Sequence, residues 1–171
     1  DYREQFKLNG DIITKEAFAR LADAVKKACE QLPEPPSEFE KAVALAFLYF
    51  KECNCDFVVL EVGMGGTDDA TNVIGTPEVA AVVNIDYDHM NFLGNTLKEI
   101  AEKKAGIIKE TGTVVIAAQN KSVEKLLVDT CIRKNARFVV TSVAELKIKQ
   151  KSVRGQSFDY RNYKGLELSL L

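Results

Sequence analysis

Apolar and polar positions follow a helical spacing in the first third of the chain. Residues 14–31 form the first amphipathic pattern, and Thr14 stands where an N-cap is favoured. A second helix is predicted from Ser37, which matches a capping box with Glu40. The body of this second helix, KAVALAFLYF, is apolar on nearly every face, so we expect it to be deeply buried.

Two short runs of β-branched and apolar residues, at 56–60 and 79–85, predict strands covered on both faces. Thr96 and Glu99 form another capping box, which opens a helix that ends near residue 109. The elements predicted after it are a strand at 113–117, a helix at 122–135 and a strand at 136–141. Helices and strands that alternate at these spacings are typical of right-handed βαβ units around a parallel sheet.

The pattern changes after about residue 144, where polar and apolar positions alternate singly. Gly155 and Lys164-Gly165 stand at turn positions, so the segment predicts antiparallel hairpins. We therefore predict an α/β fold, with a three-layer, mostly parallel sheet at 1–143 and a small antiparallel β segment of the same domain at 144–171.

Composition narrows the class of protein. A chain of 171 residues with 46% hydrophobic residues is long enough for one sizeable core. Its net charge of -2, without a concentrated basic block, argues against nucleic acid or a membrane surface as a partner. The sequence shows neither an apolar run of membrane-spanning length nor the plan of a signal peptide, so we expect a cytoplasmic protein with reduced cysteines.

One glutamate and the single histidine stand beyond predicted strands, where open α/β sheets bind ligands. Glu61 follows DFVVL directly, and His89 follows AVVNIDYD a few residues beyond its strand. Two interpretations stay open for both residues. They either bind a ligand at the sheet edge, or they serve structure, the glutamate as a cap for loop N–H groups and the histidine as a surface hydrogen-bonding group.

The stretch LEVGMGGTDDATNVI is glycine-rich, but it has no Gly-Lys-Ser/Thr and lacks the dinucleotide-binding spacing. Phosphate is therefore not its evident ligand. On the next helix, we expect Lys103 on a solvated face, in an i,i+4 pair with Glu99. The small residues Ala105 and Gly106 permit close helix packing, which would bring Lys104 toward the sheet edge.

Three stretches resemble successive signatures of one family: VLEVGMGGTDDATNVI, DYDHMNFLGNTLKEIAEKKAGIIK and SEFEKAVALAFLYF. The family is folylpolyglutamate synthase/dihydrofolate synthase, a branch of the Mur ligase superfamily, and the resemblance runs from about Phe6 to the last residue. It implies a central ATPase domain of P-loop NTPase type. Members of this family use ATP and Mg²⁺ to phosphorylate the carboxylate of dihydropteroate or a reduced folate, and the amine of glutamate then attacks the acyl phosphate.

The resemblance implies ATP, glutamate and a pterin or folate as small-molecule partners, and a monomeric full-length enzyme. Glu61 and His89 match the family's magnesium ligands at the ATP phosphates, and a hard cation that keeps its waters needs few protein carboxylates. Lys104 matches a lysine that is carbamylated in the family and helps to organise the metal site, which completes the implied catalytic set. The positions that match the family's pterin contacts are Ser37, Phe39, Asp69 and Ala70.

The chain departs from the family pattern at several positions. Thr67 replaces the usual arginine after the double glycine, and Lys103 replaces a glutamate before the key lysine. The usual Thr-Ser before the histidine segment is also replaced, and Asn84 with Asp88-His89 is similar to the pattern of the Mur ligases themselves. These changes bear on acceptor recognition more than on the metal site.

Two alternatives stay open: a Mur or cyanophycin-type amide ligase with another acceptor acid, and a non-catalytic α/β remnant. The chain begins without Met in a polar segment and ends in an apolar run, so we expect a piece of a longer protein. By the resemblance, the nucleotide loop and the glutamate-binding domain lie outside it, and we expect the piece alone to be inactive. An exposed strand edge would favour its self-association.

Overall fold

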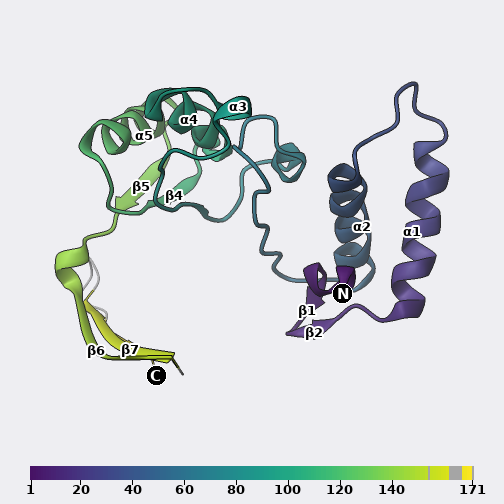
Figure 1. Ribbon diagram of the computed structural model, residues 1–171, viewed down its shortest axis with the longest axis horizontal. Helices are drawn as coiled ribbons and strands as arrows, with labels where there is room; N and C mark the ends of the chain where they lie inside the picture. The colour runs from purple at the N-terminus through teal and green to yellow at the C-terminus, as the bar shows by residue number, and fades with distance from the viewer. Residues whose placement is uncertain (154, 162–166, 171) are drawn as a thin grey trace. The chain divides into compact units, whose positions relative to one another are not determined.

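The structure is a computed structural model that describes residues 1–153, 155–161 and 167–170 (Figure 1). The chain divides into two compact units, Asp1–Gly63 and Met64–Leu171. Each unit has a hydrophobic core of its own. Among the described residues, none of the helices has both the length and the hydropathy that crossing a membrane requires.

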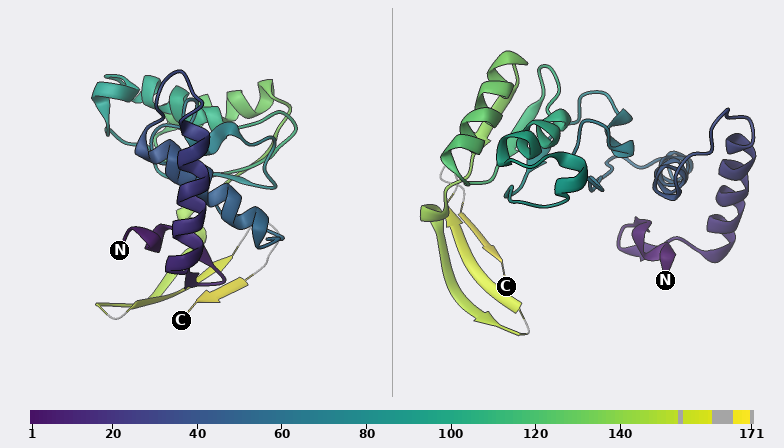
Figure 2. Two further views of the ribbon diagram at one scale, coloured as in Figure 1. Left: turned by 90° about the vertical axis from the view of Figure 1, so that its right-hand side faces the viewer. Right: turned by 45° about the horizontal axis from the view of Figure 1, so that its top comes forward.

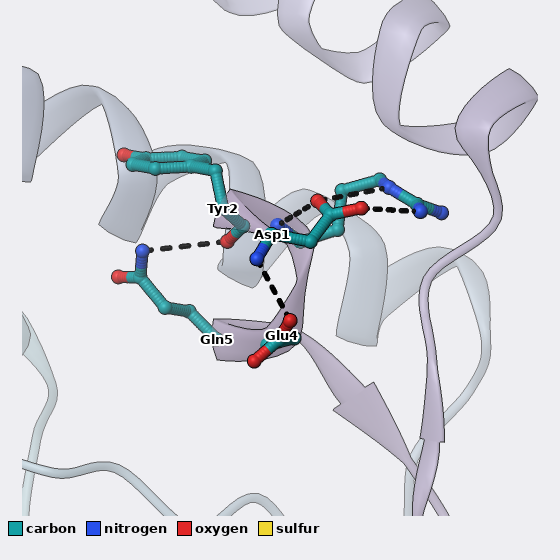
Figure 3. Close-up of polar contacts among 5 residues, drawn as sticks. Asp1, Tyr2, Glu4 and Gln5 are labelled. Carbon is teal, nitrogen blue, oxygen red and sulfur yellow. Dashed lines mark hydrogen bonds and ion pairs between the residues drawn. The ribbon is translucent and has the colours of Figure 1, made fainter.

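The first unit consists of short N-terminal elements and two helices. The 3-10 helix η1 (Tyr2–Gln5) is closed by polar contacts near the N-terminus: the Asp1 amine donates to Glu4 Oε1 at 2.7 Å, and Gln5 Nε2 donates to Tyr2 O at 3.3 Å (Figure 3). The elements that follow are β1 (Lys7–Leu8), β2 (Asp11–Ile12), α1 (Lys15–Cys29) and α2 (Glu38–Glu52). Strands β1 and β2 pair as an antiparallel hairpin, and α1 and α2 lie side by side (Figure 1).

Both helices of this unit begin at the predicted caps. Ala17 N donates to Thr14 Oγ1 at 3.2 Å, and Glu40 N donates to Ser37 Oγ at 3.2 Å. The Glu40 carboxylate accepts from the backbone N–H of Ser37 in return, which completes the capping box. The prediction of these two helix starts is confirmed.

The predicted deep burial of α2 is wrong. Only Ala42 and Leu45 are buried in this helix, whereas Leu48 is 39% exposed. Within its unit the helix packs on α1 and joins a core of Phe6, Ile13, Leu21, Val25, Ala42 and Leu45. Two packed helices cover only one face of each, so an apolar sequence all around α2 exceeds what this unit can bury.

The predicted strand at 56–60 does not form. Residues 57–60 have no strand conformation, and Phe57 and Val59 are 82% and 94% exposed. A strand needs a neighbouring backbone to satisfy its N–H and C=O groups, and no segment in the described part of the chain pairs with this one. The apolar pattern therefore indicated strand propensity without the pairing that a strand requires.

The second unit contains a parallel sheet of three strands in the order β3-β4-β5. Its strands are β3 (Ala80–Val82), β4 (Thr113–Ile116) and β5 (Arg137–Val140). Ala80 is paired with Val114 and Thr113 with Arg137, so β4 is the central strand. The predicted parallel sheet is confirmed, but the strand predicted at 79–85 is shorter than expected. Its predicted cover on both faces is wrong, because burial alternates along β3 and only one face lies in the core.

Helices connect these strands, and the short helix η2 (Ala70–Val73) precedes the first of them. The connecting elements are α3 (Met90–Leu93), α4 (Leu97–Lys104), η3 (Ala105–Ile107) and α5 (Lys121–Arg133). Side chains from α4, α5 and β4 meet in one core, where Ile100, Leu127 and Ile116 are all 0% exposed. The capping box of Thr96 and Glu99 starts α4 as predicted, but this helix ends at Lys104 and continues as η3.

An antiparallel unit follows η4 (Val143–Glu145), in the strand order β6-β7-β8. Its strands are β6 (Leu146–Ser152), β7 (Gly155–Arg161) and β8 (Glu167–Leu170). Figure 2 shows β6 and β7 running side by side in the yellow-green C-terminal segment. The predicted α/β class with antiparallel hairpins is confirmed, and the turn predicted at Lys164-Gly165 lies outside the described residues.

Candidate functional site

The glycine-rich loop of the second unit is organised around Asp69. Met64 N donates to Asp69 Oδ2 at 2.9 Å, and Thr71 donates to Asp69 Oδ1 from its N–H at 2.9 Å and from its hydroxyl at 2.6 Å. Asp69 is the N-cap of η2, and Ala70 is the first residue of that short helix. Both Asp69 oxygens therefore accept hydrogen bonds from the loop that carries them.

The same loop contacts the C-terminal end of α4. Lys103 O accepts hydrogen bonds from Thr67 N at 2.9 Å and from Thr67 Oγ1 at 3.1 Å. Lys103 Nζ lies 2.7 Å from Asp68 Oδ2, in an ion pair that also joins the loop to the helix. The first of these contacts joins Thr67 and Lys103 directly, and both are positions where the chain departs from the family pattern.

The Lys103 side chain is 44% exposed, as predicted for a solvated face, but its predicted pairing with Glu99 is wrong. Lys103 pairs with Asp68, and the Glu99 carboxylate accepts from Asn95 N at 2.8 Å and Thr96 N at 3.0 Å instead. A carboxylate that caps its own helix start is held away from a lysine one turn later. The sequence held one signal of the contact between the loop and the helix. Thr67 and Lys103 both depart from the family pattern, and they are hydrogen-bonded to each other.

His89 has an unusual backbone conformation beyond the carboxyl end of β3. Its φ of 48° is left-handed, and it is the N-cap of α3 without a side-chain cap bond. A non-glycine residue in this region costs roughly 1–3 kcal/mol, which other contacts must offset. Asp88 holds the residue, since Asp88 Oδ1 accepts from His89 N at 2.8 Å and Asp88 Oδ2 lies 3.5 Å from His89 Nε2.

Lys104 is the last residue of α4 and is half-buried. Within the described part of the chain, its ammonium group has neither a hydrogen bond nor an ion pair. Its neighbour Lys103 is neutralised by Asp68, so the two adjacent lysines differ in what they can bind. A half-buried cation without a counterion is suited to an anionic ligand or to chemical modification.

Three predicted site residues lie in the first unit. The Ser37 hydroxyl donates to Glu40 Oε2 at 2.7 Å, and this bond, with that of the Ser37 N–H, lowers the pKa of the Glu40 carboxyl. Phe39 is 41% exposed, and its ring covers Gly63, where an added Cβ would lie 2.5 Å from the ring Cζ. Glu61 is exposed, without a hydrogen-bond partner among the described residues.

The predicted magnesium pair takes one ligand from each unit, Glu61 from the first and His89 from the second. Their pairing therefore stays a prediction. His89, Lys104, Asp69 and Ala70 belong to one unit, and Ser37, Phe39 and Glu61 to the other. In the described ranges, no three His, Cys, Asp or Glu side chains gather as metal ligands.

Comparisons with known proteins agree on one family. Residues 14–170 match the Mur ligase middle domain. A dihydrofolate synthase/folylpolyglutamate synthase of Bacillus subtilis is 44% identical over 121 residues, which cover 68% of this chain and 28% of that protein. A folylpolyglutamate synthase structure from Thermotoga maritima has a TM-score of 0.81 at 34% identity, covering 94% of this chain and 37% of its own.

A solved FPGS–AMPPCP–folate complex is also similar, with a TM-score of 0.83 at 28% identity. It covers 98% of this chain and 43% of its own length. The chain thus spans less than half the length of each of these relatives. The similarity extends over nearly all of the described fold.

Proposed function

Because this chain belongs to the folylpolyglutamate synthase/dihydrofolate synthase branch of the Mur ligase superfamily, we propose that it serves an ATP-dependent ligase that adds L-glutamate to dihydropteroate or a reduced folate. The observation that carries the proposal is His89, which has a left-handed backbone beyond the carboxyl end of β3, and Lys104 without a counterion at the end of α4 supports it. Ligands of open α/β sheets bind beyond the carboxyl ends of the strands. Relatives solved with AMPPCP and folate support the nucleotide and the acceptor.

The proposed reaction has two steps. The γ-phosphoryl group of ATP is transferred to the acceptor carboxylate, which gives an acyl phosphate and ADP. The amine of glutamate then attacks the acyl carbon, an amide bond forms, and phosphate leaves with the electron pair of the broken C–O bond. Positioning and charge compensation supply most of the catalysis in phosphoryl transfer.

Lys104 is proposed to carry a carbamate in the active protein. Its amine has no hydrogen-bond or ion-pair partner in the described part of the chain, so no such contact has to break when the amine attacks carbon dioxide and releases a proton. The product is an anion where an unmodified lysine is a cation. This anion would help to organise a metal site rather than repel it.

Glu61 and His89 are proposed to hold Mg²⁺. Their chemistry fits, because the Glu61 carboxylate is exposed without a protein partner and the His89 imidazole is 49% exposed. Magnesium usually takes one or two protein carboxylates together with waters and substrate phosphates. When bound, the ion supplies positive charge that offsets the charge of the phosphates.

The pterin is proposed to contact Ser37, Phe39, Asp69 and Ala70. The half-exposed Phe39 ring offers a face for stacking on a flat heterocycle. A carboxylate offers about four acceptor sites, and Asp69 uses three of them for its loop, which leaves one for a pterin N–H. The Ser37 hydroxyl is engaged with Glu40, so it would contribute its remaining lone pair.

We also propose that the enzyme acts as a cytoplasmic monomer on small molecules, without nucleic acid or membrane partners. Residues 1–143 and 144–171 would be parts of one central domain. Residues 1–171 alone contain no Gly-Lys-Ser/Thr loop, so we expect them to show no ligation. Exposed Phe57 and Val59 would favour their self-association.

The test is ADP release by the complete gene product supplied with ATP, Mg²⁺ and glutamate, with dihydropteroate compared with a reduced folate. We expect pterin-dependent turnover that falls by at least about a hundredfold in His89→Ala. Met90→Ala, at a 40% exposed neighbour, serves as the matched control and should keep turnover. Protein that binds ATP but turns over with neither pterin would contradict the proposal and favour an acceptor of the Mur or cyanophycin type.

A further inference from the structure

Lys104 lies between two backbone positions that one loop holds by hydrogen bonds. On its N-terminal side, Lys103 O accepts both hydrogen bonds of Thr67. On its C-terminal side, Gly106 O accepts from Asn72 Nδ2 at 3.3 Å. The carbonyls at a helix C-terminus lack intrahelical donors, so the loop supplies donors there.

Asn72 joins the two sides of this arrangement. Its Nδ2 also donates to Thr67 O at 3.3 Å, and the backbone oxygen of Asn72 accepts from Lys109 Nζ at 3.2 Å. The half-buried side-chain amide of Asn72 thus bonds both Thr67, which holds Lys103, and Gly106. We call the contact of residues 66–72 with residues 103–109 the loop clamp.

Two glycines allow the loop clamp to close. A Cβ at Gly106 would lie 2.3 Å from Thr67 Oγ1 and 2.4 Å from Thr67 Cα. A Cβ at Gly66 would lie 2.9 Å from Lys103 O and 3.0 Å from Lys104 O. The loop backbone therefore passes in direct contact with the backbone of Lys104, and no side chain other than hydrogen fits at these two points.

We propose that Asn72 and Thr67 are positioning residues for Lys104, acting through the backbone on either side of it. The inference rests on the proposed function, in which Lys104 takes part in catalysis. Neither residue needs to touch a substrate. Removal of their hydrogen bonds would let the last turn of α4 move, and a displacement of about 1 Å in a catalytic group can cost about a hundredfold in rate.

A double-mutant cycle on the complete gene product separates positioning from general stability. Asn72→Ala is expected to lower kcat by about tenfold to a hundredfold, with less than about a twofold effect once Lys104→Ala is already present. Equal effects in the two backgrounds would overturn the proposal, because a purely structural residue acts additively. Thr67→Ser, which keeps the N–H and hydroxyl donors, should retain kcat, whereas Thr67→Val should lower it.

A second readout needs no ligase activity. In carbon dioxide-free buffer, competitive acetylation of the unliganded protein reports the reactivity of each lysine by mass spectrometry. We expect Asn72→Ala to change the reactivity of Lys104 by at least about threefold and to leave that of exposed Lys121 unchanged. Unchanged Lys104 reactivity would refute positioning.

The two readouts fail separately. If Lys104→Ala keeps full turnover, the catalytic role of Lys104 fails while the acetylation result still decides whether Asn72 positions this lysine. If turnover depends on Lys104 but the cycle is additive and the acetylation is unchanged, the proposed function stands and the positioning role is wrong.

Discussion

The unit Met64–Leu171 buries apolar residues of β3 and β4, whereas the unit Asp1–Gly63 leaves an apolar run open to solvent. In the second unit, Val82 and Val114 are 5% and 1% exposed, because β3 and β4 pair in a parallel sheet under α4 and α5. In the first unit, Phe57 and Val59 are 82% and 94% exposed, without a paired backbone in the described chain. The residue types are alike and the environments differ.

This difference teaches that cover by neighbouring elements, more than apolar content, decides where stability resides. A valine stabilises a fold through the area that it removes from water, at about 25 cal/mol per Å². Val114 removes nearly all of its side chain, and Val59 removes almost none. Substitutions of the same kind in the two units should therefore have very different costs.

The largest effect is expected for a substitution of the buried valine in this comparison. Val114→Ala should lower the free energy of unfolding by about 2–4 kcal/mol, because it leaves a cavity in the core that covers the buried face of β4. Val59→Ala is the matched control and should change it by less than about 0.5 kcal/mol. Urea unfolding of both variants measures the difference, and equal costs would show that residues 57–60 are buried in solution.

A second effect concerns close packing in the loop clamp. Gly106→Ala should cost about 1–3 kcal/mol, since the new methyl group meets the backbone of Thr67. Turnover should fall as well, because displacement of residue 106 also disturbs the hydrogen bond that Gly106 O accepts from Asn72 Nδ2. Gly75→Ala is the control, since a Cβ there has nothing within 4 Å.

Thermal unfolding and steady-state turnover of the two glycine variants together test whether the loop contacts the end of α4. A Gly106→Ala protein as stable and as active as Gly75→Ala would mean that the loop and the end of α4 do not touch in solution. A stable but inactive Gly106→Ala protein would instead sharpen the positioning role of the loop clamp.

The smallest effect compares the capping boxes of the two units by their pH dependence. Hydrogen bonds from Ser37 lower the pKa of Glu40, and those from Thr96 and Asn95 lower the pKa of Glu99. A carboxylate whose pKa is lower in the folded state adds stability above its unfolded pKa. That stability is lost as the pH falls through the folded pKa.

Glu40→Gln and Glu99→Gln should therefore each lose less stability than the parent protein when the pH is lowered from about 6 to about 3. Glu99 accepts three hydrogen bonds and Glu40 accepts two, so we expect the larger change for Glu99. Thermal melts across this pH range measure it. A parallel acid limb for parent and variants would contradict the assignment of these bonds.

Local signals in the sequence predicted the parts of the fold that local contacts form. Thr14, Ser37 and Thr96 each cap a helix through a donor only three residues away, so the helix starts could be read from spacing. The strand at 56–60 could not be judged in this way. Its formation depends on a partner backbone, and a run of apolar residues carries no information about that partner.

The candidate site shows the same limit. The positions of His89 and Lys104 on their elements followed from pattern and resemblance, but the left-handed backbone of His89 depends on its surroundings. The ion pair of Lys103 joins residues 35 positions apart, so the nearer Glu99 was the wrong expectation. The bonds of Asn72 to Gly106 likewise became visible only once the loop and helix were placed together.

The close contact of Thr67 with Gly106 has a consequence for how these two segments evolve and for how they can be engineered. Thr67 fills the space that a side chain at position 106 would need, so the loop at 64–72 and the helix end at 103–107 must be exchanged together. A chimaera that takes the loop from a relative with a bulky residue at position 67, and keeps this helix end, would pair surfaces that were never selected together. Grafting both segments at once would transfer the matching shapes intact.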